Sequence, residues 1–238
     1  MAITLVSEAT TGNSGNAGSY TFSSGGRAVS ADGRYVVYYS DASDLVASDT
    51  NGDYDIFLYD TVSQTTTLIS KDTASGPSNS GSSEPSFSAD GRYVVYESSA
   101  SDLVAGDTNG TRDIFLYDTV TQTTALVSKD ASGNPSNGVS YKPSISADGR
   151  YVVFESFASN LVAGDTNGTF DIFLFDTVSQ TTTLISKDAS SGPSNGASVA
   201  PSISGDGRYV VWASDATDLV AGDTNGLQDI FVHDRQTG

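Results

Sequence analysis

The chain has 238 residues and a mass of 24.6 kDa, enough for one or two domains with a sizeable core. Its 29 acidic residues against 11 Lys and Arg give a net charge of −18, which argues against nucleic acid as a partner. The chain contains no Cys, so disulfides, zinc–thiolate sites and thiol catalysis are excluded.

The N-terminus carries no recognisable secretory signal, because the apolar segment Met1–Leu5 is too short and has no basic flank. No stretch approaches the ~20 apolar residues of a membrane helix, so we expect no membrane insertion. The localisation is unknown from sequence. An extracytoplasmic location is plausible if an export signal has been removed.

Four copies of one unit follow each other with a period of 58 residues. Each copy contains S-A-D-G-R-Y-V-V, or S-G-D-G-R-Y-V-V in the fourth, and its Asp falls at Asp32, Asp90, Asp148 and Asp206. A fixed period of this size is typical of solenoids, arrays and propellers rather than of separate domains.

Each unit shows the pattern of four β-strands, a to d, and no helical periodicity. The second strand is apolar on both faces, which predicts burial on both sides, whereas the fourth alternates as an outer strand does. In the second copy the predicted strands are Pro85–Ala89, Arg92–Ser98, Asp113–Tyr117 and Thr123–Ser128. The a–b connection is an Asp-Gly turn, and the b–c loop carries D-T-N-G.

Repeated four-stranded antiparallel units predict an all-β fold, a β-propeller of four blades. The segment Ile3–Ser7 matches the last strand of a unit, whereas the fourth unit reaches only its c–d turn at residues 234–238. We therefore expect the N-terminal strand to complete and close the last blade. The predicted single domain, 1–238, has blades at approximately 20–70, 83–129, 141–187, and 199–238 plus 3–7.

The units S-A-D-G-R-Y-V-V-[YF]-E-S, D-L-V-A-G-D-T-N-G and D-I-F-L-[YF]-D resemble the TolB-like (WD-like) propeller repeats of bacterial proteins over nearly the whole chain. The resemblance implies a propeller and an interaction scaffold of mixed role. Such propellers usually have six or more blades, whereas this chain has four units. A monomeric four-bladed ring is favoured because closure within one chain needs no second molecule, and a homodimeric eight-bladed ring is the alternative.

The b–c loops and the d–a connections share one face of the predicted propeller, and both vary between copies. Aromatic and Arg side chains at loop tips are typical of binding hot spots. They predict a partner-binding surface for a protein or a glycan, although unconstrained loop tips also drift in sequence. The candidate partner-binding residues are Tyr54, Arg112, Phe170 and Gln228, and the variable d–a pairs are Ser83-Glu84, Tyr141-Lys142 and Val199-Ala200.

Each b–c loop also carries D-T-N-G-x-x-D. Oxygen side chains at positions 1, 3 and 7 around a Gly are able to converge on a calcium ion, while the same residues form a metal-free Asx turn. Calcium is therefore a possible cofactor of modest affinity. The candidate metal ligands are Asp49, Asn51, Asp55, Asp107, Asn109, Asp113, Asp165, Asn167, Asp171, Asp223, Asn225 and Asp229.

No residues give a strong signal of catalysis. His233, the single His, stands where other copies have Tyr or Phe, which predicts an aromatic strand position. Glu97 and Glu155 are equivalent in neighbouring units and are the candidate pair of a carbohydrate-active hydrolase, although a solvated or ion-paired Glu is expected more often. We expect a non-catalytic scaffold with calcium-ordered loops; the alternatives are that hydrolase and a structural or engineered ring without a ligand.

Overall fold

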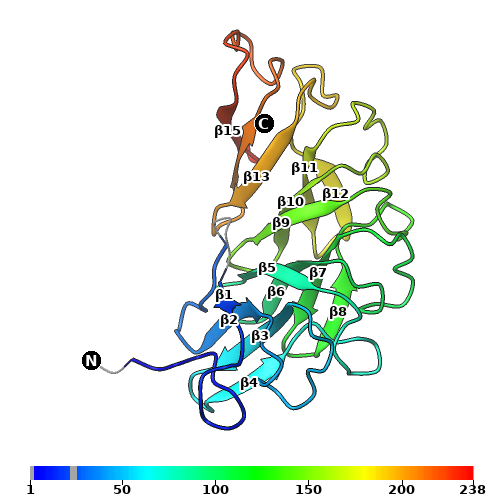
Figure 1. Ribbon diagram of the computed structural model, residues 1–238. Helices are drawn as coiled ribbons and strands as arrows, with labels where there is room; N and C mark the ends of the chain where they lie inside the picture. The colour runs from blue at the N-terminus through cyan, green and yellow to red at the C-terminus, as the bar shows by residue number, and fades with distance from the viewer. Residues whose placement is uncertain (1–2, 22–25, 238) are drawn as a thin grey trace.

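The computed structural model describes residues 3–21 and 26–237, and all regular secondary structure within them is β-strand (Figure 1). The strands form four antiparallel sheets in which neighbours in space are neighbours in sequence. Met1, Ala2 and Gly238 of the predicted domain lie outside the described residues. None of the described segments forms an apolar helix of the length needed to cross a membrane.

The four sheets correspond to the four predicted blades, which confirms the all-β repeat architecture. Blade 1 contains β1 (Ser19–Tyr20), β2 (Tyr35–Ser40), β3 (Asp55–Asp60) and β4 (Thr65–Leu68). Blade 2 contains β5 (Ser82–Phe87), β6 (Tyr93–Ser98), β7 (Asp113–Asp118) and β8 (Thr123–Leu126). Blade 3 contains β9 (Ser140–Ile145), β10 (Tyr151–Ser156), β11 (Asp171–Asp176) and β12 (Thr181–Leu184). Blade 4 contains β13 (Ser198–Ile203), β14 (Tyr209–Ser214) and β15 (Asp229–Asp234).

The blades follow one another along an arc, with blade 1 and blade 4 at its two ends (Figure 1). The first strands lie on the inner side of the arc, where β9 contacts both β5 and β13. The last strands, β4, β8 and β12, lie on the outer side (Figure 1). This order places every b–c loop on one rim and every c–d turn on the opposite rim.

The hydrophobic core lies between blades rather than within one sheet. The second strand of each blade points alternate residues to its two neighbours: Val94 and Tyr96 pack toward blade 1, and Val95 packs toward blade 3. Three apolar layers result, between blades 1 and 2, 2 and 3, and 3 and 4. The doubly apolar strands predicted from the sequence are confirmed, because each sheet is covered on both faces in the middle of the arc.

The a–b turn joins neighbouring blades as well as neighbouring strands. In blade 2, Ser88 Oγ donates to Asp90 Oδ1 at 2.6 Å, and the backbone N–H of Arg92 donates to the same oxygen at 3.0 Å. Gly91 follows with φ +78°, a conformation that favours glycine. A Cβ at Gly91 would lie 2.8 Å from Cδ2 of Tyr35 in blade 1, so the turn also fits closely against the preceding blade.

The first strand of each blade differs from the prediction. β5 begins at Ser82, and Pro85 lies inside the strand instead of at its start. A register shift between Ser83 and Ser86, with Glu84 at φ 51°, forms an irregularity in which the missing N–H of the proline breaks no regular ladder. The pairs expected in d–a connections therefore belong to the inner strands β5, β9 and β13.

The predicted closure of the ring by residues 3–7 is not confirmed. Blade 4 has three strands, with β15 at its edge, and residues 3–7 form no strand. The segment instead lies along blade 1, where Val6 packs against the cluster of Tyr38, Phe57 and Leu68. The two ends of the arc are apart in the structure, so no hydrogen-bonded ladder joins them (Figure 1).

The turn glycines provide a direct test of the contact between blades. We expect Gly91→Ala to lower the free energy of unfolding by about 2 kcal/mol or more, from the strain at positive φ plus the overlap with Tyr35. The control is Gly110→Ala in the same blade, at φ +67° with no atom within 4 Å of the new Cβ, which we expect to cost only about 1 kcal/mol. The measurement is the free energy of unfolding in urea. An equal loss of this free energy in the two variants would contradict the close fit of Gly91 against Tyr35.

Candidate functional site

The b–c loops form a hydrogen-bonded turn in all four blades. In blade 2, Asn109 Nδ2 donates to Asp113 Oδ2 at 2.6 Å and to the carbonyl oxygen of Ser136 at 2.9 Å. Asn109 Oδ1 accepts the backbone N–H of Thr111 at 2.9 Å, which is an Asx turn. The second and third predicted metal ligands of the loop therefore bind each other. The same Asn–Asp bond recurs between Asn51 and Asp55, Asn167 and Asp171, and Asn225 and Asp229.

The last Asp of the motif is the first residue of the third strand and is fully buried in blades 1 to 3. Asp113 Oδ1 accepts the hydroxyls of Ser128 at 2.5 Å and Ser136 at 2.9 Å, so this carboxylate ties the third strand to the following connection. Burial still dominates its ionisation and raises the pKa of Asp113 above the ordinary value. The equivalent Asp55 and Asp171 have pKa values raised by burial to about 6.

The first Asp of the motif differs from the other two predicted ligands. Asp49 and Asp107 are buried, and one carboxylate oxygen of each has no hydrogen-bond partner; one buried oxygen of Asp223 is also unpartnered. Burial and the nearby charge of Asp113 raise the pKa of Asp107 to about 6. An orphaned buried oxygen beside a second carboxylate suits a cation. No group of three or more His, Cys, Asp or Glu forms a metal site among the described residues. Calcium thus stays a prediction.

The four predicted partner-binding residues occupy equivalent positions, directly before the third strand, on the b–c rim. In blade 1, the ring of Tyr54 lies 5.7 Å from that of Tyr39 and 6.2 Å from that of Tyr20. Tyr20 and Tyr39 stack at 5.4 Å. A loop residue, a β2 residue and a residue of the inner strand therefore form one aromatic cluster.

A second aromatic cluster spans blades 2 and 3. The guanidinium of Arg112 lies over the ring of Tyr141 at 5.6 Å. The ring of Phe170 lies 6.1 Å from that of Tyr141 and 5.5 Å from that of Phe157. In blade 4, Gln228 Nε2 donates to Asp215 Oδ1 at 3.3 Å.

We call these residues the aromatic strip: Tyr20, Tyr39, Tyr54, Arg112, Tyr141, Phe157 and Phe170. The sequence reasoning missed Tyr20, Tyr39 and Phe157 as binding residues. A signal for them is nevertheless present, because Tyr39 stands where other copies have Glu97, Glu155 and Ala213, and Phe157 stands where they have Asp41, Ser99 and Asp215. In each blade, positions that differ between copies come together beside the b–c loop.

The two candidate catalytic carboxylates are buried and join neighbouring blades. Glu97 Oε1 forms a 2.9 Å ion pair with Arg112, and its Oε2 accepts the backbone N–H of Lys142 in the next blade at 2.9 Å. Glu155 lies 3.4 Å from Lys142 Nζ and accepts the backbone N–H of Ala200 at 2.5 Å. Burial raises the pKa of Glu97, and the Lys142 N–H and Arg112 oppose that shift. The expected Lys and Arg pairing of these residues is present.

His233 lies on β15 opposite Val210, as Tyr59 lies opposite Val36 in blade 1. It therefore occupies the strand position that the sequence indicated. Burial lowers the pKa of His233, with smaller contributions from the positive charges of Arg235 and Lys187. This environment favours a neutral imidazole packed in the strand.

A scan against protein-family models finds no match, and neither does a search of the curated proteins. Solved structures are similar in fold. TolB from Acinetobacter baumannii aligns with TM-score 0.52 and 20% identity over 91% of this chain and 42% of that one. A putative TolB from Agrobacterium tumefaciens aligns with TM-score 0.52 and 22% identity over 88% of this chain and 61% of that one. An oligogalacturonate lyase from Vibrio parahaemolyticus aligns with TM-score 0.53 and 13% identity over 86% of this chain and 49% of that one.

This chain spans less than two thirds of the length of each of these three proteins. At these identities the likeness shows the fold: a TolB-like β-propeller architecture, in agreement with the resemblance of the repeats. It assigns no activity.

The buried loop carboxylates predict an unusual pH dependence of stability. Asp55, Asp107 and Asp171 have folded pKa values of about 6, above the unfolded value of ~3.9, so the folded state binds their protons more tightly. We expect the melting temperature in chelator to rise as the pH falls from 7 to 5. The Arg-paired Asp60, with a pKa lowered to about 2, loses its contribution only below about pH 4.

Two variants separate these contributions. Asp107→Asn should raise stability at pH 7 and flatten the profile, because it removes one buried charge. Asp176→Asn should lower stability at the same pH, because it breaks the 2.9 Å pair with Arg150. A melting temperature that decreases as the pH is lowered from 7 to 5 would show that the pKa values of these carboxyl groups are not raised in the folded protein.

Calcium binding in the b–c loops has its own signature. If the orphaned oxygens of Asp49 and Asp107 bind the ion, millimolar calcium raises the melting temperature at pH 7, and less so at pH 5 where protons compete. Asp107→Asn should then reduce the calcium effect. Superimposed melting curves in calcium and in chelator, with no metal by elemental analysis, would leave the loops as turns only.

Proposed function

From the TolB-like propeller fold shared with these structures, we propose that the chain is a non-catalytic scaffold that binds a protein or a glycan on its aromatic strip. The proposal depends on one observation, the location of the positions at which the four copies differ. The framework of the repeat is nearly constant, whereas the positions that change from blade to blade lie side by side on the b–c rim and build this surface.

The chemistry of the strip supports contact with a ligand. Tyr20, Tyr54 and Phe157 are all partly exposed, while each remains packed against another ring. Flat aromatic faces with restricted rotation offer large contact area at low entropic cost, and Tyr and Arg are enriched among residues that dominate binding. The net charge of −18 opposes a nucleic-acid ligand.

The strip rests on a rigid support. Glu97, buried between two blades, holds the guanidinium of Arg112, which in turn lies over Tyr141. The Asx turn of Asn109 fixes the backbone of Thr111 and Arg112, the two residues directly before Asp113. Side chains positioned in this way lose little freedom on binding, which favours affinity.

A carbohydrate-active hydrolase that uses Glu97 and Glu155 is the alternative function. The backbone N–H bonds and ion pairs of both carboxylates support a structural role instead, because each oxygen faces a protein donor. Loss of a glycoside hydrolysis activity in Glu97→Gln, with the melting temperature unchanged, would favour the hydrolase.

The scaffold proposal is tested on a glycan array and by pull-down with the immobilised full chain. We expect the triple variant Tyr54→Ala, Arg112→Ala and Phe170→Ala to weaken each retained ligand by about tenfold or more, because it removes the centres of both aromatic clusters. A matched control replaces the exposed Val62, Val120 and Val178 on the opposite rim with Ser. Equal binding by both triple variants would show that the ligand binds outside the aromatic strip.

A further inference from the structure

Two side chains come close on the b–c rim of every blade: the residue directly before the third strand and the residue directly after the second. The pairs are Tyr54 with Asp41, Arg112 with Ser99, Phe170 with Phe157, and Gln228 with Asp215. In blades 2 and 4 the pair is hydrogen-bonded, at 3.2 Å and 3.3 Å. In blade 3 the two rings are in contact, with centroids 5.5 Å apart. The pairs of these three blades are therefore satisfied within the chain.

The pair in blade 1 is not satisfied in this way. Asp41 Oδ1 is covered and has no hydrogen-bond partner among residues 3–21 and 26–237, and none of the ion pairs within these residues includes Asp41. The negative charge of Asp41 is the main cause that raises the pKa of Tyr54. A carboxylate without a charge partner therefore acts directly on a tyrosine of the rim.

Asp41 borders the blade 1 part of the aromatic strip, which we call the tyrosine cluster: Tyr20, Tyr39 and Tyr54. Tyr20 and Tyr54 are 50% and 40% exposed, and the ring of Tyr54 is inclined at 63° and 66° to its two neighbours. Glu84 adds a second negative charge, which acts together with burial to raise the pKa of Tyr39. Exposed tyrosine faces attract cations, and negative charge beside them strengthens the attraction.

The tyrosine cluster lies at the junction of blades 1 and 2, and the structure describes the strands of both. Tyr39 packs against the apolar layer between these blades. The backbone N–H of Ser82, the first residue of β5, donates to the carbonyl oxygen of Tyr54 at 2.7 Å. The cluster therefore belongs to a complete junction within the arc.

Blade 2 shows how this rim holds a cation. Arg112 occupies the position equivalent to Tyr54, and its guanidinium lies over the ring of Tyr141 at 5.6 Å and pairs with Glu97 at 2.9 Å. The cation is thus held by a tyrosine face and a carboxylate. Blade 1 provides tyrosine faces and a carboxylate, while no Lys or Arg in the described part of the chain lies over the rings of the tyrosine cluster. A cation from another molecule would complete the same arrangement.

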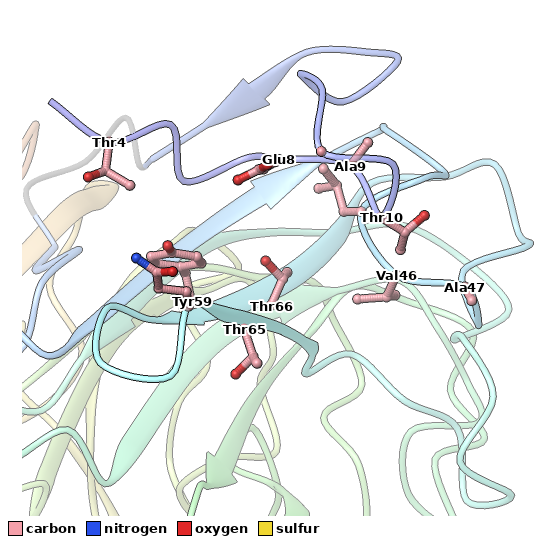
Figure 2. Close-up of a pocket in the computed structure, with 12 residues that line it drawn as sticks. Thr4, Glu8, Ala9, Thr10, Val46, Ala47, Tyr59, Thr65 and Thr66 are labelled. Atoms are coloured by element: carbon pink, nitrogen blue, oxygen red, sulfur yellow. The ribbon is translucent and has the colours of Figure 1, made fainter.

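A pocket on the same blade offers no comparable site. Figure 2 shows Thr4 and Glu8 on one side of this pocket and Tyr59 on the other. Glu8 is the charged side chain among its described lining residues, and the aromatic ring, Tyr59, is buried. A cation in this pocket would meet a carboxylate without an accessible ring face. Tyr59 also lies near the c–d end of β3, whereas Tyr54 precedes β3 at the b–c rim.

We infer that the tyrosine cluster, with Asp41 beside it, binds a basic side chain presented by a partner protein. This inference rests on the proposed function and narrows its ligand from a protein or a glycan to a protein segment that carries Arg or Lys. The net charge of −18 steers such a segment toward the protein. Arg suits the site best, because its planar and weakly hydrated guanidinium stacks on aromatic faces.

A peptide array is the first test. It displays short peptides with random neighbours around a central Arg, Lys, Gln or Glu, and it is probed with the labelled full chain. We expect about tenfold more retention on the Arg and Lys peptides than on the Gln and Glu peptides, from contact of the cation with the rings and the carboxylate. Raising the salt concentration from about 0.05 M to about 0.5 M should reduce this retention severalfold, because salt screens the charges. Equal retention on all four sets of peptides overturns the inference.

Asp41→Asn tests the carboxylate, because it removes the charge and keeps the size of the side chain. We expect this variant to bind the best Arg peptide about fivefold more weakly. The control is Asp215→Asn, the same substitution at the equivalent position of blade 4, which should leave the binding unchanged. Binding that is unchanged in both variants, or weakened equally in both, contradicts the role of Asp41.

Tyr54→Arg supplies the cation from within the chain, at the position that Arg112 has in blade 2. We expect the new guanidinium to pair with Asp41 and to abolish binding of the Arg peptide, while the melting temperature shows that the fold is kept. The matched variant Tyr54→Phe keeps the ring and should bind the peptide like the unaltered chain. If both variants bind it equally well, the peptide does not contact this site.

The outcomes also separate this inference from the proposed function. A ligand that is lost in the triple variant of the aromatic strip, yet binds equally to Asp41→Asn, shows that the strip is a binding site without a role for a basic side chain. Retention of none of the peptides likewise overturns the inference, and the glycan array and pull-down then decide on the proposed function independently.

Discussion

Each sheet in this protein is apolar on both faces, and no blade is able to bury both faces by itself. Val94 and Tyr96 face one neighbour while Val95, one residue away, faces the other. A strand with this pattern is stable only between two layers, so the blades stack in a row whose stability is the sum of similar junctions. The constraint also explains why Ile230 on β15, at the end of the arc, is exposed, whereas its equivalents Ile114 and Ile172 in the middle blades are fully buried.

A second constraint acts on the b–c rim: polar groups buried at the ends of the strands need hydrogen-bond partners. Asp113, Ser128 and Ser136 satisfy one another inside the protein, and Asn109 connects this group to the loop. Because the framework is complete without them, the two residues between Gly110 and Asp113 are free to change from blade to blade. A variable surface on a fixed, hydrogen-bonded rim is well suited to recognition.

The period of 58 residues, the strand count per unit and the tight a–b turn could be predicted because each leaves a local pattern in the sequence. The start of the first strand could not, since Pro85 indicates a boundary and the irregularity at Glu84 that accommodates it depends on pairing with β6. The aromatic strip was predicted only at its loop tips, because Tyr20 and Phe157 reach it through tertiary packing. Ring closure is not confirmed for a related reason: matching ends in sequence carry no information on the angle between blades.

Hydrogen-bonded partners in every sheet are strands adjacent in sequence, and this order has kinetic consequences. Short connections make each meander quick to assemble relative to folds that pair distant segments, so blades are able to form one after another as the chain leaves the ribosome. Nearly identical blades also invite mispairing between neighbours, a known hazard of repeat proteins. The junction position is Tyr39 in blade 1, Glu97 and Glu155 in blades 2 and 3, and Ala213 in blade 4, and each Glu accepts a backbone N–H of the next blade. Blade 3 stacked on blade 1 would meet Tyr39 instead of Glu97, so the Lys142 N–H would lose its carboxylate partner and the wrong order would separate more readily.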